Sequence, residues 1–127
     1  MDILIVNLMI MLKLSSIMIG TMQIEVMAKF YEELFGKAAD MVESGWHGWS
    51  VDNSYFMVGE HSDMAGNSKD AGRIMFNFET NEIKAEFDRI VALGAKVIKK
   101  LDESEENVIA TLADPDGNYF QLMAPWK

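Results

Sequence analysis

The sequence predicts an α+β fold built from two βαβββ modules. The first observation is the order of expected elements, which run strand, helix and three strands on each side of a polar, glycine-bearing segment. The second is an internal repeat at an offset of 57 residues. Six of the 22 positions from 17 to 38 match their counterpart, where about one or two identities are expected by chance. A period of this length indicates two copies of one supersecondary unit.

The first module begins with a β-branched strand, 16–21, and continues with a helix over 23–35. The helix is predicted by apolar residues at three- and four-residue spacing: Ile24, Met27, Phe30, Tyr31 and Leu34. Gly36 is a natural residue to end this helix. Three short strands follow, with turns at Gly45 and at 52–53; they are 39–43, 48–51 and 54–60.

The second module repeats this order after the loop 61–72. A strand is expected over 73–79, and Asn81 is a good N-cap for a helix that runs to Leu93. The acidic run 102–106 is expected to be a solvated turn, and the sequence DPDG at 114–117 favours a tight turn. The remaining strands are expected over 96–101, 108–112 and 119–124.

We divide the chain into an N-terminal extension and two modules joined by a linker, all within one domain. The ranges are 1–13 for the extension, 14–61 for the first module, 62–71 for the linker and 72–127 for the second module.

The first dozen residues are unusually apolar. They are too few for a membrane helix, which needs about 20, and they lack the basic start and small-residue cleavage site of a secretory signal. We expect an added strand or helix that covers a sheet edge or a partner subunit. Alternatively, Met11 is the biological start and the residues before it are an upstream extension. We expect the protein to be cytoplasmic.

Composition excludes several classes of site and partner. The chain has no cysteine, which rules out disulfides, thiol nucleophiles, zinc held by cysteine and iron–sulfur clusters. Its net charge of −9 repels phosphate backbones and anionic lipid. We therefore expect neither nucleic acid nor a membrane surface as a partner.

Two segments carry a resemblance to a known family. The first is MAKFYEELFG in the first helix, and the second is DPDGNYFQL at the last strand. With the duplicated module, they make the chain, over about residues 14–125, resemble the vicinal oxygen chelate superfamily. That superfamily includes glyoxalase I, extradiol dioxygenases, fosfomycin-resistance enzymes and bleomycin-binding proteins. The resemblance implies that the paired modules form an open, barrel-like mixed sheet around a cleft, often in a homodimer.

The resemblance also implies four metal-ligand positions, which fall on Ser16, Met57, Arg73 and Gln121 in this chain. The metal enzymes of the superfamily carry His, Gln or Glu there. Divalent cations prefer carboxylate oxygens and imidazole nitrogens, so only Gln121 is a reasonable ligand. A guanidinium among the ligands would repel a dication. We therefore expect no metal and no other cofactor.

Strand alternation extends this set of four residues to further side chains that would face the same cleft: Met18, Tyr55, Met75, Asn77, Tyr119 and Met123. The opposite set is strongly apolar and suits packing under the helices: Ile17, Ile19, Phe56, Val58, Ile74, Phe76, Phe78, Phe120 and Leu122. The methionines either adapt the cleft to a ligand or fill it as core.

Two alternative roles are possible for Arg73, and two for a pair of tryptophans. Arg73 either binds a carboxylate or phosphate, or forms an internal ion pair with Glu60 or Glu79. Trp46 and Trp49 either clamp a flat or cationic ligand, or one of them packs in the core or a dimer contact.

These residues favour a metal-free binder of a small aromatic or acidic molecule, with no assigned catalytic residue. One alternative is a metal-dependent lyase or dioxygenase whose displaced site uses His47, Glu60, His61 or Gln121. Another is a subunit whose role is assembly, and in each case a homodimer is expected. Whether a reaction is catalysed stays open at this point.

Overall fold

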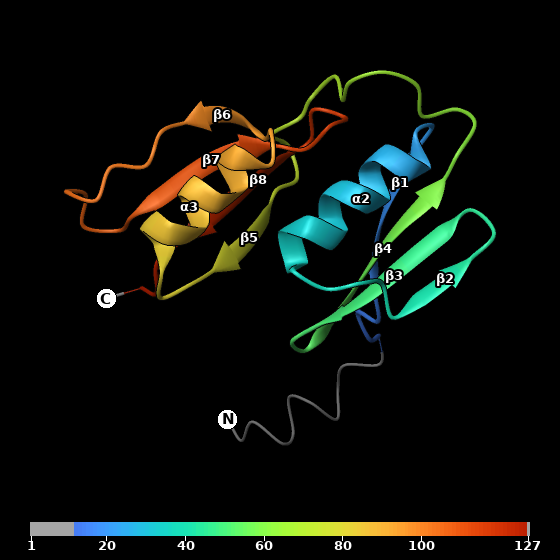
Figure 1. Cartoon of the computed structure of the whole chain (residues 1–127), viewed down its shortest axis with the longest axis horizontal. Coiled ribbons are helices and arrows are strands. Elements are labelled where there is room, and N and C mark those ends of the chain that lie inside the picture. Colours follow the sequence, from blue (N-terminus) through green and yellow to red (C-terminus); the bar gives the residue numbers. More distant parts are fainter. Residues whose placement is uncertain (1–11, 127) are drawn as a thin grey trace.

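A computed structural model describes residues 12–126 of the chain. Its elements follow the predicted order twice (Figure 1). The first module contains β1 (Ile17–Thr21), α2 (Ile24–Phe35), β2 (Met41–Glu43), β3 (Trp46–Val51) and β4 (Ser54–Glu60). The second contains β5 (Phe76–Glu79), α3 (Ile83–Ala92), β6 (Lys96–Lys99), β7 (Ile109–Ala113) and β8 (Tyr119–Met123). The segment 1–11, most of the predicted N-terminal extension, lies outside the described residues.

The two modules form separate four-stranded sheets of identical topology. The strand orders are β1-β4-β3-β2 and β5-β8-β7-β6, with one parallel pair in each sheet. The parallel pairs place Met18 beside Met57 and Asn77 beside Gln121. This mixed topology confirms the predicted α+β fold of two βαβββ modules, and the sheets do not close on each other.

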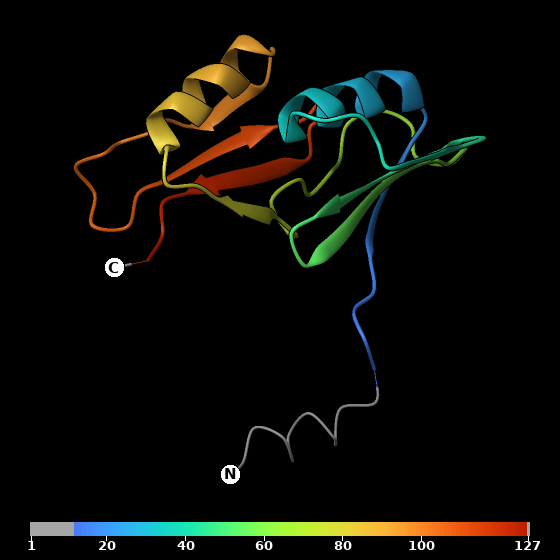
Figure 2. The same ribbon diagram turned by 60° about the horizontal axis from the view of Figure 1, so that its bottom comes forward.

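Both helices lie on the same side of the two sheets, which leaves the opposite sheet faces uncovered (Figure 2). We call these uncovered sides the open faces. The other side carries the core, because strand alternation places its apolar residues under the helices. Buried there are Met27, Tyr31, Trp49, Phe56, Val58, Ile90, Leu112, Phe120 and Leu122. The predicted apolar set is therefore found in this core or packed against it, with Ile17 and Ile74 as exceptions.

Ile74 is 75% exposed because β5 begins only at Phe76. The strand predicted over 73–79 was therefore too long at its start. Its first residues belong to the end of the loop, where the backbone N–H of Arg73 donates to the carbonyl of Asp70 at 3.0 Å.

The ends of the helices follow local chemistry. Gly36 has φ of 71°, and its N–H donates to the Glu32 carbonyl, so α2 ends at a left-handed glycine as predicted. The predicted N-cap at Asn81 was wrong, because Glu82 holds the N-cap position of α3 and makes no side-chain cap bond. Instead, the Thr80 hydroxyl accepts the Glu82 N–H at 3.0 Å, as the Thr21 hydroxyl accepts that of Gln23 before α2.

Polar contacts from three side chains join the modules. The Tyr31 hydroxyl donates to Asp114 at 2.7 Å, and the Gln23 amide donates to Asp116 at 2.6 Å. The Arg89 guanidinium donates to the carbonyls of Glu33 and Leu34 at the end of α2, at 2.7 and 2.8 Å. These contacts fix the first helix against the second module.

Candidate ligand-binding site

A cavity of about 750 Å³ lies where the two modules meet, between the β3–β4 turn and β5. Its size is within the range of small-molecule sites. The first module contributes one side through β1, the end of α2, the β3–β4 turn and the start of β4, and β5 contributes the other. The lining residues are Ile17, Phe35, Val51, Asp52, Ser54, Tyr55, Phe56, Met75, Phe76, Asn77, Phe78 and Glu79.

Aromatic rings form much of this wall. Phe56 of the first sheet packs against Phe76 of the second, with ring centroids 5.4 Å apart and planes at 83°. Phe35 lies 5.2 Å from Phe56 and 5.8 Å from Phe78, again edge to face. Edge-to-face packing favours a fixed arrangement of the rings. The cavity therefore offers a firm apolar surface to a flat ligand.

The charged side chains that line this cavity are both acidic. Asp52 lies in the β3–β4 turn at φ of 53°, a left-handed conformation that Asp tolerates better than most residues. Glu79 ends β5 and is exposed. No lysine, arginine or histidine is among the lining residues. The cavity thus attracts positive or neutral aromatic groups more than acids.

Three of the predicted ligand-binding residues line this cavity: Tyr55, Met75 and Asn77. Tyr55 also crosses Gly48 on the neighbouring strand, where an added Cβ would lie 2.7 Å from the tyrosine Cε2. Only glycine leaves room for the ring there, so Gly48 fixes where Tyr55 lies.

Three further predicted residues lie together on the open face of the first sheet: Met18, Trp46 and Met57. The Trp46 ring crosses Gly59, where an added Cβ would lie 2.9 Å from the indole Cζ3 and 3.2 Å from the Met18 sulfur. Met18 is 47% exposed and Trp46 37% exposed, whereas Met57 is half-buried. The arrangement leaves an apolar surface beside β1.

Trp49 lies in the core, on the other side of the sheet from Trp46. It is fully buried, its indole nitrogen donates to the Lys37 carbonyl at 3.1 Å, and its ring packs 5.7 Å from Phe35. Positions 46 and 49 are an odd number of residues apart on β3, so they face opposite sides. The two tryptophans therefore cannot clamp one ligand, and Trp49 is a core residue.

Arg73 lies outside the cavity. Its exposed guanidinium is 3.8 Å from Asp70, and neither Glu60 nor Glu79 is its partner. The internal ion pair and the cleft position expected from the sequence both depended on a strand that begins at 73, whereas β5 begins at Phe76.

The remaining predicted residues are dispersed. Ser16 is exposed just before β1, and Met123 is buried on β8. The Gln121 amide donates to the Thr111 hydroxyl at 3.1 Å on the open face of the second sheet. Tyr119 lines a different cavity at the end of that sheet.

The resemblance implied metal ligands at four positions, which are Ser16, Met57, Arg73 and Gln121 in this chain. They carry a hydroxyl, a thioether, a guanidinium and an amide, where divalent cations prefer carboxylate and imidazole. Across residues 12–126, no three His, Asp or Glu side chains gather in a group that could hold a metal ion.

Sequence reasoning missed the two carboxylates and the four phenylalanines of the cavity. The phenylalanines, Phe35, Phe56, Phe76 and Phe78, have the spacing of core residues, and they become cavity lining only because two sheets meet there. Asp52 was placed correctly in a turn, but nothing in the sequence indicates that this turn faces β5.

The most buried ionisable groups, Tyr31 and Asp114, join the two modules but do not line this cavity. Burial raises the pKa of Asp114, against the opposing hydrogen bonds from Tyr31 and Asn118. Burial, with the nearby Asp114 carboxylate, holds the pKa of Tyr31 well above its ordinary value, so the tyrosine remains a donor. This pair is part of the framework and not of the cavity.

Comparison with known proteins gives a consistent family. A family model described as the glyoxalase-like domain matches residues 16–123. A search of curated proteins finds no match. Among the helices of the described part of the chain, none has the length and apolar character needed to cross a bilayer.

Solved structures share the fold at low sequence identity. A hypothetical protein from S. aureus has a TM-score of 0.76 and 16% identity, over 94% of this chain and 99% of that one. The fosfomycin resistance protein FosX from Mesorhizobium loti has a TM-score of 0.73 and 16% identity, over 92% and 94%. A glyoxalase/bleomycin resistance protein/dioxygenase family enzyme from Burkholderia phytofirmans has a TM-score of 0.70 and 23% identity, over 89% and 98%.

Proposed function

The chain belongs to the glyoxalase-like domain family, and from this premise we propose that it binds a small aromatic molecule, without a metal ion, in the cavity between the β3–β4 turn and β5. The observation that carries the proposal is the lining of that cavity. Aromatic rings from both modules meet there, beside two carboxylates and no basic side chain. A neutral or cationic aromatic ring fits this surface best, because ring faces and carboxylates both attract positive charge.

The structure gives less support to the acidic ligand that the sequence also allowed. That expectation depended on Arg73, which is exposed, paired with Asp70 and absent from the cavity wall. An acid placed in this cavity would instead meet Asp52 and Glu79. We therefore propose that the site discriminates by charge, in favour of cations over anions of the same shape.

A metal-dependent lyase or dioxygenase with a displaced site is the less favoured alternative. His61 accepts the Asp63 N–H through Nδ1 at 3.2 Å, so one of its ring nitrogens is already occupied. His47 stacks on Trp49, with ring centroids 6.3 Å apart, on the helix side of the sheet. His47 therefore does not share a site with Gln121, which lies on the open face of the other sheet.

We further propose that the protein is a cytoplasmic homodimer. The dimer is supported by the apolar surface on the open face of the first sheet, where Met18 and Trp46 are exposed side by side. Exposed apolar patches of this kind are typical of surfaces that a partner covers. A second copy of the chain is the partner we expect.

The binding proposal is tested with benzyltrimethylammonium, an aromatic cation, titrated into ¹⁵N-labelled protein. We expect the backbone amides of Tyr55 and Asn77 to shift in the NMR spectrum. The Asn77→Trp variant fills the cavity and should weaken binding at least tenfold. Asn81→Trp is the matched control, because Asn81 is exposed and outside the cavity. Unchanged affinity in Asn77→Trp would contradict the proposal.

Charge selection is tested with the Glu79→Gln variant. A partly exposed carboxylate contributes roughly 0.5–1 kcal/mol to a nearby cation, so we expect about a two- to fivefold loss of affinity for benzyltrimethylammonium. Glu43→Gln removes an exposed carboxylate from β2, away from the cavity, and should have no effect. Equal losses in the two variants would show a general charge effect and not a site.

A further inference from the structure

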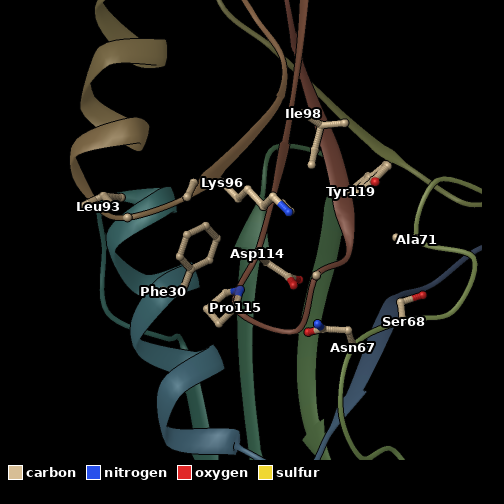
Figure 3. Close-up of a pocket in the computed structure, with 14 residues that line it drawn as sticks. Phe30, Asn67, Ser68, Ala71, Leu93, Lys96, Ile98, Asp114, Pro115 and Tyr119 are labelled. Atoms are coloured by element: carbon tan, nitrogen blue, oxygen red, sulfur yellow. The ribbon is translucent and has the colours of Figure 1, made fainter.

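A second cavity, of about 460 Å³, lies at the end of the second sheet where β7 turns into β8, and it shares no lining residue with the first. It is enclosed by the end of α3, the start of β6, the β7–β8 turn and the segment before β5 (Figure 3). One residue of the first module, Phe30 of α2, completes its wall.

Backbone hydrogen bonds hold the loop side of this cavity in place. The Ser68 N–H donates to the Asp116 carbonyl at 3.1 Å, and the Tyr119 N–H donates to the Ala71 carbonyl at 3.2 Å. Asn67 packs against Gly117, where an added Cβ would lie 3.3 Å from the Asn67 Cγ. The loop therefore forms a fixed wall, with Asn67 and Ser68 at its rim.

The carboxylate in this wall is already satisfied. One oxygen of Asp114 accepts the N–H groups of Asp116 and Asn118 at 2.9 and 3.0 Å. The other accepts the Tyr31 hydroxyl at 2.7 Å and the Asn118 amide at 2.9 Å. Its negative charge is spread over these donors, so Asp114 serves the turn and is not a ligand-binding group.

The cationic group of the cavity is Lys96. Lys96 is an exposed residue at the start of β6, and its amino nitrogen points toward the middle of the lining residues (Figure 3). Across residues 12–126, Lys96 forms no ion pair, in contrast to Lys37, Lys84 and Lys99. The same cavity is lined by four apolar side chains, which are Phe30, Leu93, Ile98 and Pro115.

We propose that this second cavity binds a small organic anion, a carboxylate with a compact apolar body. The carboxylate pairs with the Lys96 amine, and the body packs against Phe30, Leu93 and Ile98. Asn67 and Ser68 supply polar groups at the rim. The ligand class is opposite in charge to that proposed for the first cavity, and this proposal does not depend on the first.

The test is a titration of ¹⁵N-labelled full-length protein with phenylacetate. We expect shifts of the Gly94 and Gly117 amides, which line this cavity, while those of Tyr55 and Asn77 stay in place. Lys96→Gln should weaken binding at least fivefold, whereas Lys100→Gln, an exposed neighbour outside the cavity, should not. The neutral analogue phenylacetamide should bind more weakly than phenylacetate.

A second pair of variants tests the site by changing its shape and leaving the Lys96 charge in place. Ser68→Trp narrows the rim and should weaken phenylacetate binding, whereas Ser62→Trp, at another exposed loop serine, should not. The proposal is overturned if phenylacetate shifts neither Gly94 nor Gly117. It is equally overturned if Lys96→Gln binds as tightly as the unmodified protein, or if the shifts are confined to the amides of the first cavity.

Discussion

At the scale of single residues, the hydrogen bond between Tyr31 and Asp114 is important for the stability of the fold. Both side chains are buried, and the hydroxyl donates to the carboxylate at 2.7 Å across the joint between the modules. A hydrogen bond to a charged group contributes about 1.5–3 kcal/mol. The pair therefore links the charge state of one carboxyl group to the stability of the whole chain.

We predict that Tyr31→Phe lowers the free energy of unfolding by about 1–3 kcal/mol at neutral pH. Because the lost hydrogen bond favours the charged carboxylate, the destabilisation should shrink as pH falls through the folded-state pKa of Asp114. That pKa is raised by burial, so the change occurs above the ordinary range of aspartate. Urea unfolding of the variant and of the unmodified protein at several pH values measures how the destabilisation depends on pH.

Tyr55→Phe is the matched control for this prediction, because the Tyr55 hydroxyl makes no hydrogen bond within residues 12–126. Its unfolding free energy should stay within about 0.5 kcal/mol of the unmodified protein. A loss for Tyr31→Phe that does not vary with pH would contradict the assignment of the effect to Asp114.

Single residues also show where reasoning from sequence stops. The odd spacing of Trp46 and Trp49 was sufficient to place them on opposite faces of one strand, once the strand was known to begin at Trp46. The sequence-based prediction began that strand at Gly48, so the argument was not available. Arg73 was misplaced for a similar reason, since its strand begins three residues later than predicted.

At the scale of elements, α2 and α3 are coupled through Arg89. Its guanidinium donates to the carbonyls of Glu33 and Leu34, which the last turn of α2 leaves without helical partners, and it also pairs with Glu86 at 2.6 Å. A cation at the C-terminal end of a helix is favourable. Arg89 thus caps a helix to which it does not belong.

We predict that Arg89→Met destabilises the protein by about 1–2 kcal/mol, because it removes charged hydrogen bonds to carbonyls that nothing else replaces. Lys84→Met is the matched control: Lys84 is an exposed cation on the same helix with a carboxylate partner, Asp88. An exposed pair of this kind contributes about 0.3–0.5 kcal/mol. Thermal unfolding of both variants measures the two losses of stability. Equal losses in Arg89→Met and Lys84→Met would argue against the capping role of Arg89.

The helices and strands were predicted well where the apolar periodicity was strong. Their bounds were predicted poorly where a cap residue or a strand end determines them. The spacing of Met27, Phe30 and Tyr31 identified α2, and Gly36 identified its end. At α3, Glu82 and not Asn81 is the N-cap residue, and the Thr80 hydroxyl accepts the Glu82 N–H at 3.0 Å. Asn and Thr side chains both accept backbone N–H groups at helix starts, so the sequence does not choose between them.

At the scale of the whole molecule, the repeat and the motifs predicted the fold and the family, and both are confirmed. The cavity between the modules could not be predicted, because its walls come from a turn and a strand that no local pattern connects. Phe56 and Phe76 have the spacing of core residues, yet they meet each other across the joint. Contacts between modules depend on how the modules pack, which the repeat does not specify.

The open face of the first sheet carries the prediction that concerns the whole molecule. If a second copy covers Met18 and Trp46, then a charge placed there should separate the dimer, because burying an unpaired carboxylate is costly. We expect Trp46→Asp to be monomeric at concentrations where the unmodified protein is dimeric, by light scattering after size-exclusion chromatography.

Val42→Asp is the control, because Val42 is 63% exposed and pairs with His47 in the same sheet, whereas Trp46 pairs with Gly59. Positions 46 and 47 alternate across the sheet, so Val42 faces the helix side and Trp46 the open face. A dimer that uses the open face should tolerate the charge in Val42→Asp and should not tolerate the charge in Trp46→Asp. A monomeric unmodified protein, or a dimer lost only in Val42→Asp, would contradict this arrangement, since either result would leave the open face without a partner.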